Sequence, residues 1–437
     1  MSASPFHLGW FLNGTNAPAW AQPFSGSIGE TWDDAQIFVD LARSMERAKF
    51  DYVLIEDNTF IGDRYGDSME VYLRSAIQGP RQDPMIVATL LAQATSRLGI
   101  VPTAGTFAYH PYLLARMIGS LDQLSKGRMG VNIVTGTSDR ALQNYGNDGM
   151  DEHDHRYEVA DDFLSAAQAL WGTWDADAVV ADWTTGTFAD HEKVRRADYE
   201  GPFFKTRGPL NSGPLPQGSP VISQAGGSPR GIRFAAKHAD TIVAIQATPE
   251  KAREYREAVR ASAAEQGRNP DDIKVLFCVW PTVGSSQEEA EQRAAERVQL
   301  ARDNIEVPLA AMSKSTDIDF STVPRDVPLG ELDLATNGTQ LFADYRARNA
   351  KYTLREAVAR QANGSGPSLV GSPEQVADQL EEFADIAGGD GFLIASHGVT
   401  RRFMAEICDG LVPELQRRGL TRREYDHEML RDNLRAF

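Results

Sequence analysis

Short apolar runs alternate with longer amphipathic stretches along the whole chain, and this alternation limits the possible folds more than any other feature. The apolar runs end in Gly, Asn, Thr or Ser, and the amphipathic stretches have the spacing of apolar residues that is typical of helices. Repeated βα units show this pattern. We expect eight strands, which begin near His7, Tyr52, Leu98, Arg128, Pro220, Asp240, Ile273 and Gly391.

The expected strands are apolar on consecutive residues, as in residues 53–55 (VLI) and 242–245 (IVAI). Strands of this kind are buried on both faces, which occurs in a parallel sheet covered by helices. A doubly wound open sheet is the alternative, but it normally carries a G-x-G-x-x-G motif after its first strand, and residues 8–18 (LGWFLNGTNAP) lack one. The sequence therefore predicts an α/β protein with a closed (β/α)8 TIM barrel.

Three stretches interrupt the repeat, at about residues 58–83, 175–218 and 307–366. Each is rich in Gly, Pro, Asp and aromatic residues, and two of them follow strand ends, where barrel enzymes build pockets and lids. We interpret them as insertions into one barrel domain that spans residues 1–437.

Composition excludes several classes of protein. The 61 acidic residues exceed the 44 basic ones by 17, a balance that disfavours binding to nucleic acid and to anionic membranes. The two cysteines, Cys278 and Cys408, are too few for a disulfide scaffold or a Cys-rich metal site. Neither a signal peptide nor a run of 18 apolar residues is apparent, so we expect a soluble cytoplasmic protein.

Polar residues follow several of the expected strands, where barrel enzymes bind their ligands. Taken singly, an Asn, Asp or Thr at a strand end is more often a turn or cap residue than a ligand-binding one. Their convergence on one rim of a barrel favours a site. The candidates are Asn13, Asp57, Asn58, Thr103, Thr106, Asn132, Thr135 and Ser228.

Residues 224–231 (QAGGSPRG) have the composition of an anion-binding helix start. Gly226 and Gly227 allow a close approach of the backbone, Ser228 can cap the helix, and Pro229 suits the first helical position. Free N–H groups and the positive end of the helix dipole favour a phosphate there. An ordinary capped βα loop remains the alternative.

A second group of candidates lies at the start of the helix expected after residue 153. His153 and Tyr157 are four residues apart, so both can face one ligand. A metal site that uses His153 and His155 is disfavoured, because their spacing differs from H-E-x-x-H and the two side chains face apart on a helix. The alternative to a ligand site is a solvated, acid-rich helix start that binds nothing.

No motif of the common hydrolases, phosphotransferases or thiol enzymes is present, which leaves an apolar pocket as the main chemical feature. Aromatic residues near strand ends could line it, although aromatic side chains in apolar runs are more often part of the core. The candidates for the substrate pocket are Phe11, Trp20, Phe60 and Phe107.

Several blocks of the sequence resemble the bacterial luciferase-like flavin monooxygenases. They include residues 48–58 (AKFDYVLIEDN), 111–135 (PYLLARMIGSLDQLSKGRMGVNIVT), 144–146 (NYG) with 153–164 (HDHRYEVADDFL), 208–231 (GPLNSGPLPQGSPVISQAGGSPRG) and 429–434 (MLRDNL). The most similar branch holds nitrilotriacetate and EDTA monooxygenases, the pristinamycin synthase large subunit and dibenzothiophene sulfone monooxygenase. The similarity extends from about residue 6 to the end of the chain.

The resemblance implies a two-component enzyme of xenobiotic or secondary metabolism. It would take reduced FMN from a separate NAD(P)H:flavin reductase and use O2 to oxygenate a small apolar, aromatic or heteroatom-containing compound. A homodimer or homotetramer is also implied. An F420-dependent oxidoreductase and a non-catalytic flavin-binding protein on the same barrel are the alternatives, and a metal hydrolase is the weakest option.

The resemblance also implies roles for individual residues. Asp57, Thr103 and Thr106 would lie along the flavin ring, and Asn132 would donate a hydrogen bond to it. His153, Tyr157 and Ser228, with Gly227 beside them, would hold the ribityl and phosphate end. The family's polar stretch after the first strand is replaced here by Trp20-Ala21-Gln22, which makes the substrate harder to infer than the flavin. No catalytic residue and no metal ligand is singled out.

Overall fold

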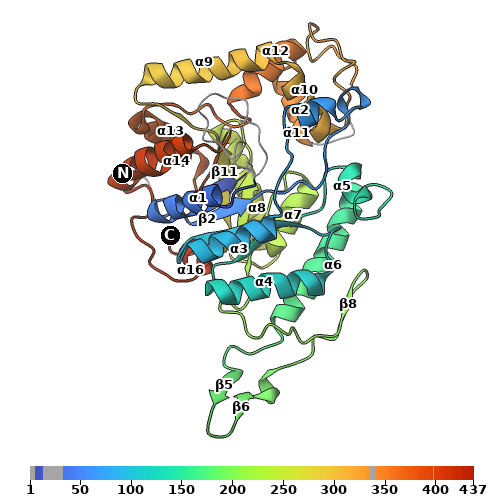
Figure 1. Ribbon diagram of the computed structural model, residues 1–437, viewed down its shortest axis with the longest axis vertical. Helices are drawn as coiled ribbons and strands as arrows, with labels where there is room; N and C mark the ends of the chain where they lie inside the picture. The colour runs from blue at the N-terminus through green and yellow to red at the C-terminus, as the bar shows by residue number, and fades with distance from the viewer. Residues whose placement is uncertain (1–4, 13–32, 335–339, 397) are drawn as a thin grey trace.

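Eight parallel strands close into a barrel, as the sequence predicts (Figure 1). The structure, a computed structural model, describes residues 5–12, 33–334, 340–396 and 398–437. The strands neighbour one another in the order β1-β14-β11-β10-β9-β4-β3-β2. They are β1 (His7–Leu12), β2 (Tyr52–Ile55), β3 (Gly99–Gly105), β4 (Gly130–Val134), β9 (Val221–Gln224), β10 (Thr241–Ala244), β11 (Lys274–Val279) and β14 (Gly391–Ala395).

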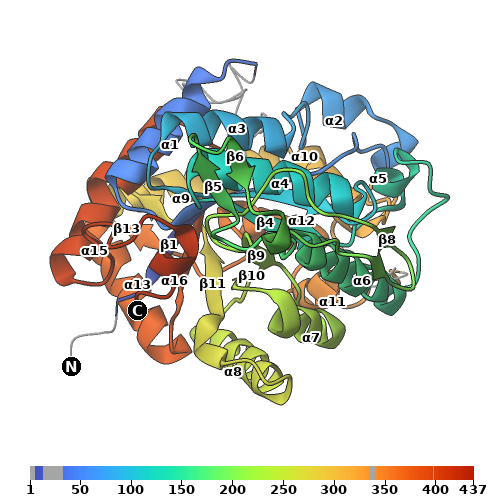
Figure 2. The same cartoon turned by 90° about the horizontal axis from the view of Figure 1, so that it is seen from below.

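Helices surround the barrel, and several begin at side-chain caps. Asp83, Ser228, Thr248 and Ser372 each accept backbone N–H groups of the helix that follows, and each is followed by a proline at the first turn. Figure 2 shows α7 and α8 on the side of the barrel opposite α1 and α3. The surrounding helices are α1 (Gln36–Arg47), α3 (Pro84–Ala94), α4 (Pro111–Ser125), α6 (His153–Trp171), α7 (Pro229–His238), α8 (Pro249–Glu265), α13 (Pro373–Ala387), α14 (Arg401–Ala405) and α15 (Val412–Arg418).

Much of the barrel interior is apolar, and the end of the chain covers the face at the amino ends of the strands. Side chains from six strands, among them Leu54, Val221 and Leu276, form one buried cluster with Leu430 and Leu434 of α16 (Leu430–Leu434). Burial of such side chains is the main favourable contribution to folding. The interior is thus filled at the amino ends of the strands. The mouth at the carboxyl ends of the strands is left for a ligand.

The first and third insertions share an apolar cluster of their own. Val71 and Tyr72 of the first insertion are buried with Leu309, Phe320 and Leu354 of the third. We call residues 58–83 and residues 305–366, which include the third insertion, the cap. Its helices gather at the top of Figure 1 and are α2 (Glu70–Arg74), α10 (Glu306–Thr316), α11 (Gln340–Arg348) and α12 (Leu354–Arg360), next to α9 (Gln287–Asp303).

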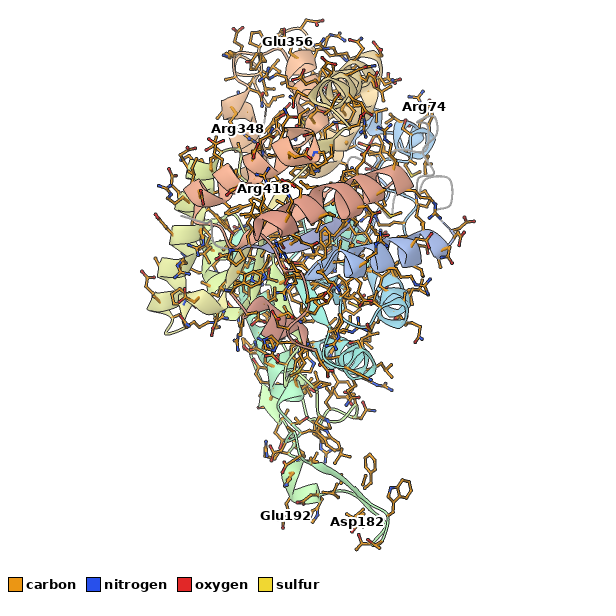
Figure 3. The ribbon with its side chains drawn as sticks, turned by 90° about the vertical axis from the view of Figure 1, so that its left-hand side faces the viewer. Arg74, Asp182, Glu192, Arg348, Glu356 and Arg418 are labelled. Carbon is orange, nitrogen blue, oxygen red and sulfur yellow. The ribbon has the colours of Figure 1, made fainter. Side chains whose placement is uncertain are left out.

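The second insertion forms two hairpins that project away from the barrel (Figure 1). The outer hairpin pairs β5 (Val179–Asp182) with β6 (Thr187–Ala189), and the inner one pairs β7 (Tyr199–Glu200) with β8 (Lys205–Thr206). Figure 3 labels Asp182 at the tip of this projection. Across the described ranges, no helix is long and apolar enough to cross a membrane. That residues 1–437 form a single domain stays a prediction.

Candidate active site

Three of the residues expected at the phosphate end of a ligand meet at the start of α7. The Ser228 hydroxyl caps this helix by accepting the backbone N–H of Gly231 at 3.0 Å, and it lies 3.2 Å from His153 Nε2. His153 is the first residue of α6, and its ring centroid is 5.2 Å from that of Tyr157, one turn further on. We call Ser228, His153, Tyr157 and the glycines beside Ser228 the helix-start cluster.

The two glycines of this loop differ in their surroundings. A methyl group at Gly226 would lie 2.7 Å from Gln224 Oε1, and the Gly226 carbonyl accepts the Tyr255 hydroxyl at 2.6 Å. A methyl group at Gly227 would meet no heavy atom within 4 Å. The loop is therefore held against the protein at Gly226, while Gly227 borders open space that a ligand can enter.

Positive charge surrounds the cluster. The Arg230 guanidinium lies 5.5 Å above the Tyr157 ring and also binds Asp161 at 2.6 Å. Burial alone would raise the pKa of Asp161, but hydrogen bonds from His238, Arg230 and Lys237 hold it well below its ordinary value. Arg156, which precedes Tyr157 in α6, is half-buried and donates to the Gly136 carbonyl, and burial lowers its pKa. The sequence analysis singled out neither arginine, although Arg230 belongs to residues 224–231 and Arg156 to residues 153–164.

Two of the four residues expected along the flavin ring, Thr103 and Asn132, lie in one layer of the barrel interior. Thr103 and Asn132 are paired in register, and the Asn132 amide donates to the Thr103 hydroxyl at 3.0 Å. Ser223 is in register with Asn132 on the next strand and lies two residues beyond Val221, which fills the interior, so it faces inward too. Thr241 continues this layer on β10.

Two polar atoms of this layer are buried without a partner. Asn132 Oδ1 and Ser223 Oγ have no hydrogen-bond partner among the described residues, and Gln224 Oε1 at the end of β9 has none either. Buried polar groups nearly always have partners, because an unpaired one loses its hydration without compensation. These atoms therefore fit a ligand that carries hydrogen-bond donors, as the polar edge of a flavin does.

Asp57 and Thr106 lie at the same rim but outside this hydrogen-bonded pair. Burial raises the pKa of the Asp57 carboxyl, partly opposed by the charge of Arg81, and Asp57 Oδ1 accepts the Asn58 N–H at 2.8 Å. Thr106 is buried, and its backbone N–H donates to the Val134 carbonyl at 3.0 Å. No hydrogen bond among the described residues joins either of them to Asn132.

Aromatic side chains stand around the mouth. Phe11 is half-buried on the interior cluster together with Trp280, the residue just beyond the end of β11. Phe107 lies edge-on to Tyr145, with ring centroids 5.4 Å apart. Phe60 belongs to the cap. Trp20, the fourth candidate for the substrate pocket, lies outside the described residues.

A buried charged cluster supports the Phe60 side of the mouth. Lys314 Nζ of α10 donates to the Phe60 carbonyl at 2.9 Å and lies 4.4 Å from the centroid of the Phe60 ring. Arg81 binds Glu56 at 3.1 Å in the same place. Burial lowers the pKa of Lys314 to about 8 and raises the pKa of Glu56. The sequence alone does not predict that Lys314 contacts Phe60, because Lys314 comes from the third insertion, more than 250 residues after Phe60.

We expect Lys314 to give the protein a pH-dependent stability. The pKa is about 8 in the folded protein against an ordinary 10.5, so the unfolded chain binds more protons between these values and stability rises with pH there. Lys314→Met should remove this rise and add about 1–3 kcal/mol to the free energy of unfolding at pH 7. Urea unfolding at pH 7 and pH 10 measures both effects, with Lys251→Met on exposed α8 as the control. An unchanged pH profile in Lys314→Met would contradict the assignment.

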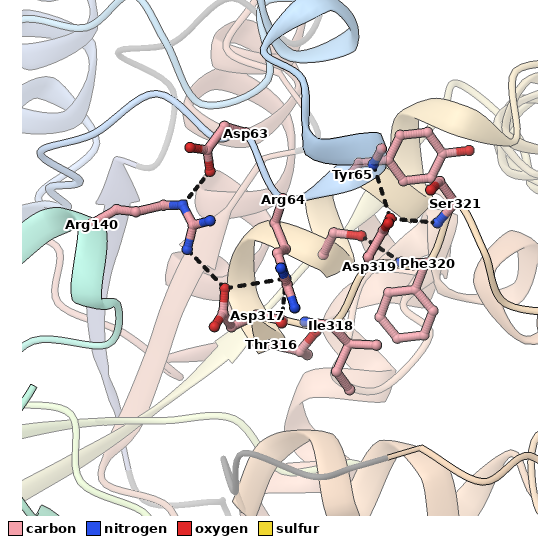
Figure 4. Close-up of polar contacts among 12 residues, drawn as sticks. Asp63, Arg64, Tyr65, Arg140, Thr316, Asp317, Ile318, Asp319, Phe320 and Ser321 are labelled. Atoms are coloured by element: carbon pink, nitrogen blue, oxygen red, sulfur yellow. Dashed lines mark hydrogen bonds and ion pairs between the residues drawn. The ribbon is translucent and has the colours of Figure 1, made fainter. Parts of the chain in front are cut away.

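Ion pairs join the cap to the barrel rim (Figure 4). Arg140 of α5 (Asp139–Gln143) binds Asp63 of the first insertion and Asp317 of the third, the latter at 3.0 Å. Arg64 donates to the Asp317 carbonyl at 2.8 Å. These contacts hold three segments that are distant in sequence around one side of the mouth.

Within the described ranges, no group of three or more His, Cys, Asp or Glu side chains is arranged to hold a metal ion. His155 instead contacts Glu158 at 3.2 Å on the exposed face of α6, while His153 turns to Ser228. The arrangement combines a capped helix start beside open space with an inward polar layer, features that a ligand site would need.

Comparison with known proteins establishes the family. The model of the luciferase-like monooxygenase family matches residues 7–390, and the chain belongs to this family. Dibenzothiophene-sulfone monooxygenase from Rhodococcus erythropolis is 37% identical over 90% of this chain and 88% of its own. Nitrilotriacetate monooxygenase component A from Aminobacter aminovorans is 31% identical over 97% of this chain and 94% of its own. The protein is thus a flavin-dependent monooxygenase, and the branch predicted from the sequence blocks is confirmed.

A solved relative adds a cofactor to the comparison. The crystal structure of riboflavin lyase (RcaE) with modified FMN and substrate riboflavin superimposes with a TM-score of 0.87 at 34% identity, over 99% of this chain and 96% of that one. The likeness confirms the TIM barrel and supports a flavin as the cofactor of this chain.

Proposed function

We propose that this protein is the oxygenase component of a two-component system, which uses reduced FMN and O2 to oxygenate a small apolar, aromatic or heteroatom-containing compound. The observation that carries the proposal is the helix-start cluster at one edge of a barrel mouth whose inner polar layer has unpaired acceptors. The phosphate of FMN needs the groups of the helix-start cluster, and the polar edge of its ring needs the unpaired acceptors. These two parts lie at opposite ends of one ligand.

The residues present fit FMN at its phosphate end. The start of α7 attracts an anion, Ser228 and His153 offer hydrogen bonds, and open space at Gly227 lets a phosphate approach the backbone. Tyr157 completes the cluster with its hydroxyl beside Gly231. The dipole of α7 and the charges of Arg156 and Arg230 favour a dianion there.

The residues of the mouth would orient the ring and keep water out. When bound, reduced FMN supplies the electrons with which O2 is cleaved, one oxygen atom entering the substrate and the other leaving as water. Asn132 and Ser223 would hold the polar edge of the ring through the atoms that are unpaired in the protein alone, and Thr103 would orient the Asn132 amide. Phe11, Phe107 and Trp280 would exclude water from the reacting face.

The proposed partner is a separate NAD(P)H:flavin reductase. The name "component A" of the nitrilotriacetate relative supports a division of labour between two proteins. Reduction by NAD(P)H also favours the cytoplasm as the setting of the reaction. The sulfone named for the other relative supports a heteroatom-containing substrate, which we propose as a class rather than as a compound.

A test of the flavin assignment is to replace Ser228 with alanine. We expect reduced FMN to bind more weakly by about 1–2 kcal/mol, the usual loss of one hydrogen bond to a charged group. Anaerobic titration of the protein with photoreduced FMN measures the affinity, and O2 uptake with a generic flavin reductase and a substrate panel measures turnover.

A matched control separates the flavin contact from the loss of a helix cap. Ser286→Ala removes the same kind of cap from α9, where Ser286 accepts the Glu289 N–H at 3.3 Å, and should leave the FMN affinity unchanged. Unaltered FMN affinity in Ser228→Ala would refute the phosphate assignment. Tighter binding of F420 than of FMN would overturn the choice of cofactor.

We also propose that the outer hairpin of the second insertion joins copies of this chain into a homodimer or homotetramer. Its tip exposes Trp183 at 95% and Phe188 at 67% on a segment that projects from the barrel (Figure 3). Exposed apolar side chains of this size are typical of interaction surfaces. Trp183→Ser with Phe188→Ser should shift sedimentation at micromolar protein toward the monomer, whereas Leu124→Ser, exposed at 82% on α4, should not. A wild-type monomer would contradict this proposal.

A further inference from the structure

The carboxyl group of Glu56, which the proposed function does not use, faces the barrel mouth. Glu56 follows β2 directly, and its backbone N–H continues the barrel ladder by donating to the Leu12 carbonyl at 3.2 Å. Leu54, two residues earlier, packs in the interior cluster, and alternate residues of a strand point to the same face. The Glu56 side chain is therefore directed into the barrel, one layer above Leu54.

The strand register places Glu56 in the inward polar layer of the site. β2 and β3 pair Ile55 with Pro102, so the next step of the register brings Glu56 beside Thr103. Thr103 is in turn in register with Asn132. Glu56 thus adds an ionisable group beside the neutral hydroxyl and amide of these two residues.

The protein holds only one oxygen atom of this carboxyl group. Glu56 Oε2 accepts a hydrogen bond from Arg81 Nη1 at 3.1 Å, and no hydrogen bond among the described residues reaches Oε1. The Arg81 side chain is 7% exposed, whereas that of Glu56 is 26% exposed. Arg81 therefore fixes the carboxyl group from the protein side, and the rest of the group is accessible to an occupant of the mouth.

Opposing effects act on the protonation of Glu56. Burial raises its pKa, the charges of Arg81 and Lys314 oppose this rise, and the charge of Asp57 adds to it. A further negative charge in the mouth would act in the same direction as Asp57 and raise the pKa of Glu56 again. A ligand with an anionic ring would thus favour the protonated form of Glu56.

The chemistry of the proposed reaction requires a proton from the protein. One oxygen atom of O2 leaves as water, which needs two protons. Because reduced FMN is a ring anion at and above neutral pH, it supplies two electrons but only one proton, and the substrate supplies the other two electrons. The second proton must come from an acid in the mouth.

We propose that Glu56 is a catalytic acid of this enzyme, which takes up a proton when anionic reduced FMN binds and donates it to the oxygen atom that leaves as water. Glu56 then returns to a carboxylate beside the neutral ring of oxidised FMN, which restores its ion pair with Arg81. A carboxyl group that is kept neutral by its surroundings can donate a proton at neutral pH. This inference rests on the proposed function, because it requires reduced FMN in the mouth.

The test measures the protons taken up when reduced FMN binds, and it needs no substrate. Anaerobic calorimetric titration at pH 7.5, in two buffers that differ in ionisation enthalpy, gives this number, and at this pH the phosphate group is already a dianion. We expect the wild type to take up at least about half a proton per chain more than Glu56→Gln, because the ring charge raises the pKa of Glu56. Glu56→Asp, which keeps a carboxyl group, should restore most of this difference.

A control and a second measurement guard against a structural effect of the substitution. Glu406→Gln removes a carboxylate that pairs with Arg293 of α9 at 2.7 Å in the helical layer, and it should leave the proton uptake unchanged. Infrared difference spectra of the wild type with and without reduced FMN should show a new band of a protonated carboxyl group. This band tests the proposal even where Glu56→Gln folds poorly.

The outcomes separate this inference from the flavin proposal. Selective loss of proton uptake in Glu56→Gln, with reduced FMN still bound, supports it. Equal uptake in the wild type and Glu56→Gln, or an equal loss in Glu406→Gln, overturns it and leaves the binding of FMN intact. Loss in Asp57→Asn but not in Glu56→Gln moves the proton to Asp57 and also overturns it. Failure of the wild type to bind reduced FMN would overturn the proposed function, and this inference with it.

Discussion

Asp51→Ala is expected to lower the free energy of unfolding by about 3–5 kcal/mol, the cost of leaving buried charges without their partner. Asp51 is buried just before β2 and binds Arg422 at 2.7 Å, His7 at 3.1 Å and the Leu8 N–H at 2.9 Å. Burial by itself would raise its pKa, but the charges of His7 and Arg422 hold the pKa below its ordinary value. The carboxylate therefore joins the first two strands to the C-terminal segment that closes the barrel.

The measurement is urea unfolding of wild type and variant at pH 7. Because the pKa of Asp51 is lower in the folded protein, the stabilisation is present at neutral pH and is lost as the pH falls through the carboxylate range, so the two proteins should converge in acid. Asp409→Ala is the control, since Asp409 pairs with Arg47 at the surface at 2.6 Å and should cost at most about 1 kcal/mol. Equal losses in both variants would show that burial does not govern the effect.

The barrel could be predicted because its strands are buried on both faces. Runs such as residues 53–55 carry this signal locally, without reference to the rest of the chain. The helix α13 was not expected, although Ser372 and Gln375 form a capping box at its start that could have revealed it. It lies between the third insertion and the last strand, and its apolar residues have the spacing of an ordinary amphipathic helix.

The same difference between local patterns and distant contacts applies to the residues of the candidate site. Ser228, His153 and Tyr157 were predicted because helix starts and four-residue spacings are local patterns, and the structure brings them together. Their role in binding flavin stays a prediction. Trp280 and Lys314 were missed because their meaning depends on contacts with residues far away in the sequence, such as Phe60. Local patterns cannot reveal pairings made by the fold.

Gly231→Ala is expected to weaken FMN binding at least about thirtyfold, or about 2 kcal/mol, with little loss of stability. The added methyl group would lie 2.8 Å from the Tyr157 hydroxyl and 3.0 Å from Gly226 Cα. Gly226 cannot retreat easily because its carbonyl accepts the Tyr255 hydroxyl, so the Tyr157 side chain must move. The substitution thus acts on the helix-start cluster while removing none of its hydrogen-bonding groups.

Gly231→Ala should lower the affinity for FMN without a comparable loss in the free energy of unfolding. Alanine is a better helix former than glycine by about 1 kcal/mol, which offsets part of the local crowding, so urea unfolding should change by less than about 1 kcal/mol. Gly410→Ala is the matched control, since Gly410 is also a helical glycine, lies outside the helix-start cluster, and its methyl group would have no heavy atom nearer than 3.6 Å. FMN titration of both variants decides the matter. Equal FMN affinities would place the phosphate away from α7, whereas a selective loss in Gly231→Ala requires it beside Tyr157.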